Sequence, residues 1–169
     1  AKLSAQLKGK KVVFHMIDYV DQSVEHYKTL SGIGKLKNSL TPYCPEGSLL
    51  TEDDETNGEL SSSASSILMK VLWAARLARP DLSRPCGKLT CKVQSWSKND
   101  DRKLRRLMEY MQSSRDLVLE GFICDAPEAL ELWLFVDADL ASDVDSTRSS
   151  SGAWLTLVGP SSYIPLSWL

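Results

Sequence analysis

The sequence predicts an α+β fold in which a helical module precedes a small antiparallel sheet. The helical module is indicated by residues 64–78, where apolar side chains recur at intervals of three and four along one stripe. The sheet is indicated by residues 130–136, whose nearly unbroken apolar run is typical of a strand covered on both faces. Two further apolar stretches, 153–158 and 163–168, are separated by a Gly-Pro-Ser-Ser turn. We therefore expect a three-stranded meander at the end of the chain.

Length and composition limit the possible classes of protein. The chain has 169 residues, of which 43% are hydrophobic, so it can form one ordinary domain or two small ones. The formal net charge of -2 gives no overall basic signal, so contact with nucleic acid must come from a local patch. The four cysteines lack the spacing of a zinc site and are expected to be free thiols. No apolar run approaches the roughly 20 residues that span a bilayer, so no membrane partner is expected.

The first third of the chain is predicted to hold one strand, one helix and a long linker. Residues 10–17 read as a short strand, and residues 19–30 carry apolar side chains at helical spacing before Gly32 ends the helix. Residues 36–60 combine prolines with an acidic run, and this composition cannot bury enough apolar surface to order itself. We expect a linker there, disordered over its acidic part, 45–60.

The middle of the chain is predicted to contain three helices. The first is capped by the serines at 61–63 and ends before Pro80, because the residue preceding a proline avoids the helical conformation. Asp81 or Ser83 is expected to cap the second helix, in which Pro85 is tolerable only in the first turn. Apolar residues at helical spacing then give this helix one buried face.

The third helix of this group carries a cationic face. Asn99 or Asp100 is expected to cap it, and a short strand is expected after it, at 117–123. Such a face is either simply solvated or follows the phosphates of a nucleic acid. The cations concerned are Arg102, Lys103, Arg105 and Arg106.

Two acids at the end of the apolar strand are the main candidates for chemistry. Asp137 ends the strand, and Asp139 is expected to lie already in the following loop, with Asp143 and Asp145. Carboxylates held there can bind Mg²⁺, and two such ions can cleave a phosphodiester. A pair of acids that only caps the loop is the structural alternative. Glycosyltransferases with a metal-bound nucleotide sugar also end a strand in Asp-x-Asp, but repeated βα units precede their motif, whereas three helices precede this one.

Several motifs, taken in order, resemble the Copia-type retrotransposon Pol polyprotein where reverse transcriptase runs into ribonuclease H. The Arg-Pro-Asp turn at 79–81 resembles that family's turn after a helix, and residues 103–111 resemble a later helix. The Asp-Ala-Asp at 137–139 with Ser-Gly at 151–152 resembles the start of its ribonuclease H. The combination, at this separation, is more specific than either motif alone.

The resemblance implies a three-part chain and an activity. Residues 1–60 would hold the end of the polymerase palm and the start of the thumb, 61–125 a thumb and connection-like helical region, and 130–169 the first three strands of a ribonuclease H-like fold. Asp137 would be the catalytic acid, and Asp137 and Asp139 metal ligands, in an enzyme that cuts the RNA strand of RNA–DNA hybrids with Mg²⁺. Hybrid or duplex nucleic acid and the rest of Pol would be the partners, in a cytoplasmic particle or the nucleus.

Departures from the family pattern limit what this chain can do alone. The Tyr-Val-Asp-Asp type of palm motif is missing, Leu140 replaces the family's tryptophan, and Ser142 replaces its glycine. The family's further acids would lie beyond Leu169, so we expect a truncated, catalytically inactive fragment. Two alternatives stay open: a helical module that binds nucleic acid without chemistry, and a decayed structural relic.

Overall fold

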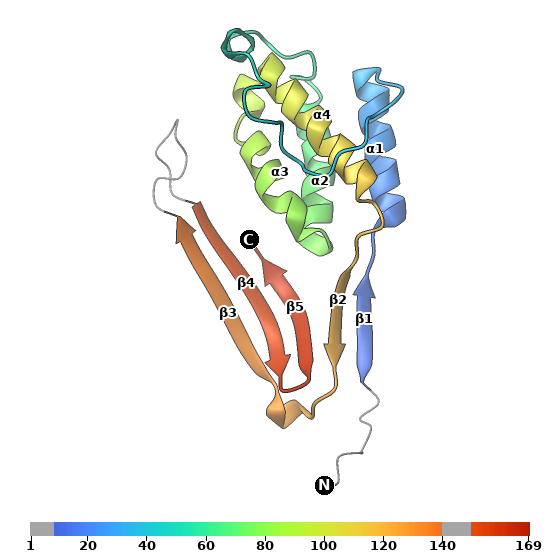
Figure 1. Cartoon of the computed structure of the whole chain (residues 1–169), viewed down its shortest axis with the longest axis vertical. Coiled ribbons are helices and arrows are strands. Elements are labelled where there is room, and N and C mark those ends of the chain that lie inside the picture. Colours follow the sequence, from blue (N-terminus) through green and yellow to red (C-terminus); the bar gives the residue numbers. More distant parts are fainter. Residues whose placement is uncertain (1–8, 140–149) are drawn as a thin grey trace. The chain divides into compact units, whose positions relative to one another are not determined.

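The computed structural model describes residues 9–139 and 150–169 and has the mixed α+β architecture predicted from the sequence (Figure 1). Four α-helices and five strands are formed by these residues, and the chain divides into two compact units. The helical unit comprises His15–Val118, and the sheet unit comprises Ala1–Phe14 together with Leu119–Leu169. These units do not follow the three consecutive ranges expected above, because the first strand pairs with a strand from the second half of the chain.

The helical unit is built around one apolar core. It contains α1 (Ile17–Ser31), α2 (Ala64–Leu77), α3 (Ser83–Thr90) and α4 (Lys98–Ser113). Three short 3-10 turns, η1 (Thr51–Asp54), η2 (Pro80–Leu82) and η3 (Val93–Ser95), lie between the helices. Each helix turns an apolar stripe inward, and removing these stripes from water is the main stabilising contribution. Fully buried members of the core include Val20, Ile67, Leu68, Val71, Cys86, Leu104, Leu107 and Met108.

The helix starts use different capping groups from those predicted. Ser97 is the N-cap of α4: its hydroxyl accepts from the backbone N–H of Asp100, whose carboxylate accepts from the backbone N–H of Ser97. Asn99 donates instead from its side-chain amide to the carbonyl oxygen of Leu50, at 2.7 Å. Ser63, the N-cap of α2, makes no capping hydrogen bond through its side chain, and Leu82 rather than Asp81 or Ser83 is the N-cap of α3. The predicted position of the α2 cap is therefore confirmed, whereas the caps of α3 and α4 lie one to three residues from the predicted ones.

The segment between α1 and α2, expected to be a linker with a disordered acidic part, is held against α4 by specific contacts. The Asp101 carboxylate accepts from the backbone N–H of Glu59 at 2.6 Å and of Leu60 at 3.2 Å. The same carboxylate accepts from the Trp96 indole N–H at 2.7 Å. Asp53 is buried near the start of α4, where cations neutralise it. Composition considers the segment alone, whereas Asp53 and the backbone N–H groups of Glu59 and Leu60 find partners on α4.

The sheet unit contains five antiparallel strands. They are β1 (Lys10–Phe14), β2 (Leu119–Ile123), β3 (Glu131–Asp139), β4 (Ser150–Gly159) and β5 (Ser162–Trp168), and a 3-10 turn, η4 (Pro127–Ala129), precedes β3. Their spatial order is β1-β2-β5-β4-β3. The last three strands therefore form the predicted meander, side by side in chain order (Figure 1).

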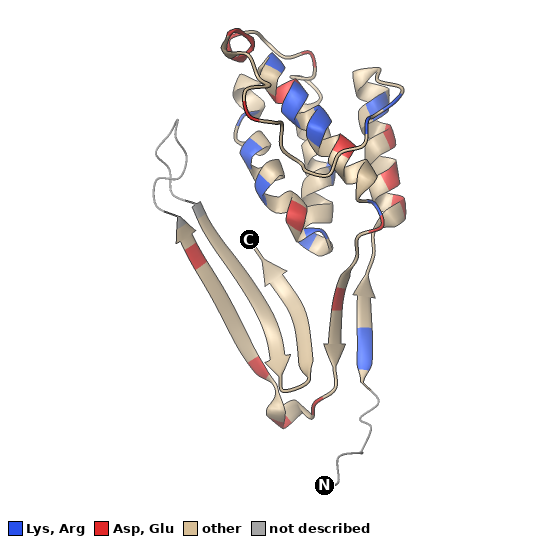
Figure 2. Ribbon diagram, in the orientation of Figure 1, with Lys and Arg blue, Asp and Glu red and all other residues tan. Residues whose placement is uncertain are grey.

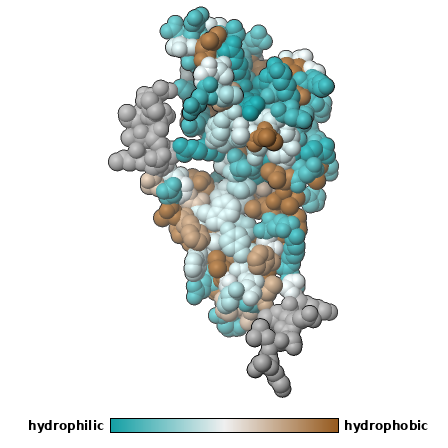
Figure 3. All heavy atoms as spheres, viewed as in Figure 1, coloured by the Kyte–Doolittle hydropathy of each residue, from teal (hydrophilic) through white to brown (hydrophobic). Residues whose placement is uncertain are grey.

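The faces of β3 differ from the prediction that both are covered. Leu132, Leu134 and Val136 lie on one face and are 66%, 61% and 72% exposed, while Trp133 and Phe135 on the other face are also exposed. The described part of the sheet unit contains strands and one 3-10 turn, so it has no second layer of its own. Hydrophobic residues are accordingly visible at the surface of the strands (Figure 3). In the described ranges, no helix is long and apolar enough to cross a membrane.

Candidate functional site

Asp137 lies inside a continuous strand and not at its end. All nine residues of β3 pair with β4, with Asp137 opposite Gly152 and Asp139 opposite Ser150. Because successive residues of a strand alternate between faces, positions 137 and 139 belong to the same face of the sheet. The prediction that Asp139 already lies in the loop is therefore wrong: β3 extends to include it. Gly152 has no side chain, so the position beside the Asp137 carboxylate on β4 is left open.

The described residues at the predicted magnesium site offer one carboxylate and do not form a complete metal site. Within residues 9–139 and 150–169, no group of three or more Asp, Glu, His or Cys side chains is placed to hold a metal ion. Asp137 offers an exposed carboxylate, while Asp143, Asp145 and the side chain of Asp139 lie outside the described residues. Phosphodiester cleavage by two metal ions needs several oxygen ligands held together. The single carboxylate of Asp137 does not meet that requirement.

Aromatic rings line the face of the sheet on which Asp137 lies. Trp133 and Phe135 precede it at two-residue intervals, with ring centroids 5.9 Å apart. On the same face, the rings of Trp154 and Trp168 stack with centroids 5.2 Å apart. Rings presented by a sheet can stack against nucleic-acid bases. This surface was not predicted, although the aromatic residues at alternate positions of β3 were a readable signal.

The charge of this aromatic face opposes contact with a polyanion. Glu131 and Asp137 are both exposed on it, and Lys11 is already paired with Glu120 at 2.7 Å. Carboxylates beside the rings repel phosphates unless a cation bridges them. The rings alone therefore do not make a nucleic-acid site.

The four cations predicted to contact nucleic acid lie on α4, and each has a partner within the helical unit. Figure 2 shows cations and acids close together along this helix. Arg102 Nη1 lies 2.6 Å from Asp53 Oδ2, and Lys103 Nζ lies 3.2 Å from Asp100 Oδ1. The remaining contacts are Arg105 Nε to Glu109 Oε1 at 3.2 Å and Arg106 Nε to the carbonyl oxygens of Thr41 and Tyr43, both at 3.1 Å.

These partners change the electrostatics of the α4 face. Arg102, Lys103 and Arg105 remain about two-fifths exposed, so solvent reaches them, but a carboxylate neutralises each one. A phosphate would have to compete with acids that are already held in place. The pair of Arg102 with Asp53 attaches the acidic segment to the helix, and Arg106 attaches Thr41 and Tyr43, so these two cations hold their own chain in place.

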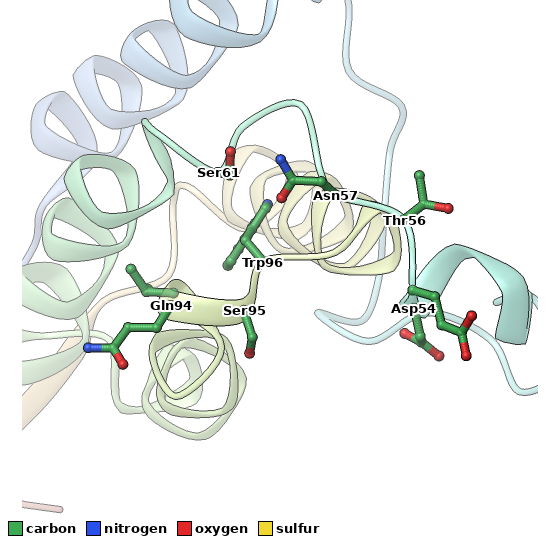
Figure 4. A pocket seen from close by; sticks show the side chains of 9 residues that line it. Asp54, Thr56, Asn57, Ser61, Gln94, Ser95 and Trp96 are labelled. Atoms are coloured by element: carbon green, nitrogen blue, oxygen red, sulfur yellow. The ribbon is translucent and has the colours of Figure 1, made fainter.

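A shallow pocket of about 310 Å³ opens beside the acidic segment (Figure 4). Its lining includes the acids Asp54 and Glu55 together with Gln94, Ser95 and Trp96. Trp96 is buried and its indole N–H already donates to Asp101, so it offers no free donor to a ligand. The two carboxylates would repel a phosphate, and the pocket is not a candidate for nucleic-acid contact.

The Arg-Pro-Asp turn forms a polar network around a buried arginine. Arg79 is 2% exposed and binds the Asp81 carboxylate through two nitrogens, Nε at 3.0 Å and Nη2 at 2.8 Å. It also donates to the carbonyl oxygen of Ser114 at 3.0 Å and to the hydroxyl of Ser114 at 2.6 Å. The Tyr110 hydroxyl donates to Asp81 at 2.9 Å. This motif therefore connects the end of α2 to the end of α4 and does not face a ligand.

Comparison of the chain with family profiles, curated proteins and solved structures finds no significant match.

Proposed function

We propose that the chain is a piece of a Copia-type Pol polyprotein, from the junction of reverse transcriptase and ribonuclease H, whose parent degrades the RNA strand of RNA–DNA hybrids. In this proposal the sheet unit holds the first three strands of a ribonuclease H-like fold. The helical unit belongs to the thumb and connection region, and by itself the chain binds nucleic acid without cutting it.

The observation that carries the proposal is the position of Asp137 in the β3-β4-β5 meander. Three antiparallel strands in chain order follow a helical unit, as the resemblance implies. Asp137 lies on the first of them with Gly152 opposite, which leaves space beside the carboxylate. The resemblance gives this acid the role of first metal ligand.

Binding without cleavage follows from what the described residues supply. One exposed carboxylate cannot position two ions, whereas electrostatic attraction to a phosphate backbone needs only accessible cations. Among the described residues of the helical unit, Arg84, Lys88 and Lys92 are exposed and have no carboxylate partner. The chain should therefore bind hybrid in a salt-dependent manner and leave the RNA strand intact.

The test uses a fluorescently labelled RNA–DNA hybrid. Anisotropy is measured over a series of salt concentrations, and the labelled RNA strand is followed on a gel after incubation with Mg²⁺. We expect an affinity that falls steeply with salt and no cleavage. The lack of any binding at low salt would refute the proposal. Magnesium-dependent cleavage that is lost in Asp137→Asn but kept in Glu131→Gln, a second exposed acid of β3, would refute the claim of inactivity.

A further inference from the structure

A stretch of the helical unit without acidic residues coincides with α3 and its C-terminal flank. From Leu82 to Asn99 the sequence holds four cations and no Asp or Glu. Three of these cations, Arg84, Lys88 and Lys92, follow each other at intervals of four residues, and all three are exposed. In Figure 2 the cations recur along α3.

The α3 cations differ from those of α4 because no acid neutralises them. Among the described residues, Arg84, Lys88 and Lys92 take part in no ion pair, and their side chains donate no hydrogen bond. The fourth cation of the stretch, Lys98, does pair with Asp53, at 3.3 Å. The row on α3 therefore keeps its full charge for an outside partner.

Helix geometry places the row on one side of α3. Residues four apart lie on neighbouring turns of the same face, about 6 Å apart along the axis. Pro85, Cys86 and Leu89 are buried and occupy the opposite side, which fixes the orientation of the helix on the core. Arg84 and Lys88 must therefore point away from the core, and Lys92 continues the row just past the helix end.

Gly87 lies between Arg84 and Lys88, and the fold gives no reason for a glycine there. A Cβ added at this position would meet nothing within 4 Å, and the residue adopts ordinary negative φ. Glycine within a helix costs about 1 kcal/mol relative to alanine. The cost is explained if a partner's backbone approaches α3 closely between the two cations.

We propose that this face of α3, formed by Arg84, Gly87, Lys88 and Lys92, binds the phosphate backbone of a nucleic-acid duplex. The proposal deepens the proposed function and rests on it, since it names the surface that makes the contact. A regular row of unpaired positive charge matches regularly spaced phosphates, and contact with the backbone needs no base recognition. An amphipathic membrane contact would require large apolar side chains beside the cations, and this face has none.

The main experiment compares two charge reversals of equal size in the full chain. Arg84→Glu/Lys88→Glu removes the row, and Lys35→Glu/Lys37→Glu makes the same change in net charge at two exposed lysines outside α3. Hybrid affinity at moderate salt should fall at least about tenfold in the α3 variant and by less than about twofold in the control. The slope of log affinity against log salt should become shallower by about 2 in the α3 variant alone, since two phosphate contacts are lost.

A second pair of variants separates binding from folding. Gly87→Ala should raise the thermal midpoint, because alanine is the better helix former, and circular dichroism checks that the helix content is kept. Gly87→Leu should keep the fold, since the position is open. It should weaken hybrid binding about tenfold, because the larger side chain holds the phosphate backbone of the hybrid away from α3. Unchanged affinity in Gly87→Leu would contradict the close approach at this position.

The outcomes distinguish this inference from the proposed function. If the unaltered chain binds hybrid and the α3 variant binds it equally well, the α3 surface is refuted while the proposed function stands. If the unaltered chain binds no hybrid at low salt, both fail. Equal weakening by the two reversals would show general charge attraction and refute the surface. Tighter binding to vesicles containing anionic lipid than to hybrid, lost in the α3 variant, would refute the nucleic-acid assignment.

Discussion

Arg79 shows how one residue can hold a fully buried charge. All three of its guanidinium nitrogens have acceptors, and Asp81 balances the charge. Burial of an ion pair is tolerated when hydrogen bonds satisfy the remaining donors, and removal of one partner then leaves an uncompensated group. The cost of changing this residue should therefore greatly exceed that of changing a surface arginine.

Replacing Arg79 by lysine should strongly destabilise the helical unit. Lysine keeps the charge but lacks the planar, forked guanidinium that contacts Asp81 and Ser114 at the same time. We therefore expect a loss of about 3 kcal/mol in the free energy of unfolding. Urea titration followed by circular dichroism measures the change. Arg76→Lys, at an exposed position one turn earlier, is the matched control and should change stability by less than about 0.5 kcal/mol.

The buried thiol of Cys86 should make the fold sensitive to alkaline pH. Burial raises the pKa of this thiol to about 12 from its ordinary value of 9.0. Between these values the unfolded chain has lost the proton and the folded chain still holds it, so stability is fully present below pH 9 and falls as pH rises towards 12. For one such group, the free energy of unfolding falls by up to about 1.4 kcal/mol for each unit by which pH rises.

Variants at two cysteines test that slope. Cys86→Ala should flatten the fall in unfolding free energy above pH 9, whereas Cys91→Ala, at an exposed cysteine, should leave it unchanged. Chemical unfolding at a series of pH values gives both curves. A slope that is unchanged in Cys86→Ala would show that another group, for example the buried Tyr27, whose pKa is also raised by burial, controls the alkaline loss.

At the scale of elements, the contact between η1 and α4 sets how much charge α4 presents. Asp53 is paired with Arg102 at 2.6 Å and with Lys98 at 3.3 Å, and its side chain is 10% exposed. If a phosphate must compete with this carboxylate, removing the negative charge should release both cations. The acidic segment would then act as a brake on nucleic-acid binding by α4.

Asp53→Asn should therefore tighten hybrid binding while loosening the segment. We expect affinity to rise about threefold at low salt and limited proteolysis within residues 45–60 to become faster, because the ion pairs that hold the segment are lost. Glu52→Gln changes an exposed acid of the same turn and is the control. It should change neither the hybrid affinity nor the rate of proteolysis by much. Weaker hybrid binding in Asp53→Asn would show that the ordered segment itself supports the contact.

The elements also show what the sequence could and could not predict. Apolar periodicity correctly indicated α2 and the β3-β4-β5 meander, because both patterns are local in the chain. The order in the acidic segment and the pairing of β1 with β2 depend on partners distant in sequence, whereas the capping box of Ser97 and Asp100 is local and was missed. The pattern indicated a cationic face on α4 but could not show that Asp53, which is distant in sequence, neutralises Arg102. The pairs of Lys103 with Asp100 and of Arg105 with Glu109 lie within the helix and could have been read from their spacing.

At the scale of the whole molecule, the chain consists of a unit with a closed core and a unit without one. Every buried residue of the main apolar cluster comes from the helical unit, whereas the sheet unit leaves large aliphatic residues exposed on β3. β3 is also an edge strand, with one side paired to β4. An exposed apolar edge is a template for pairing with other chains. The sheet unit should therefore limit the solubility of the protein.

Two substitutions on β3 should reduce self-association without disturbing the helical unit. Leu134→Thr/Val136→Thr removes exposed aliphatic surface and places β-branched threonine at both positions, so the sheet should persist. We expect light scattering at high protein concentration to fall severalfold and the thermal midpoint of the helical signal to stay within about 2 °C. Leu40→Thr/Leu50→Thr, which changes two exposed leucines outside the sheet, controls for the general loss of apolar surface and should leave scattering unchanged. An equal fall in light scattering in both variants would mean that association does not proceed through β3. A destabilised helical unit in the β3 variant would mean that the two units fold together.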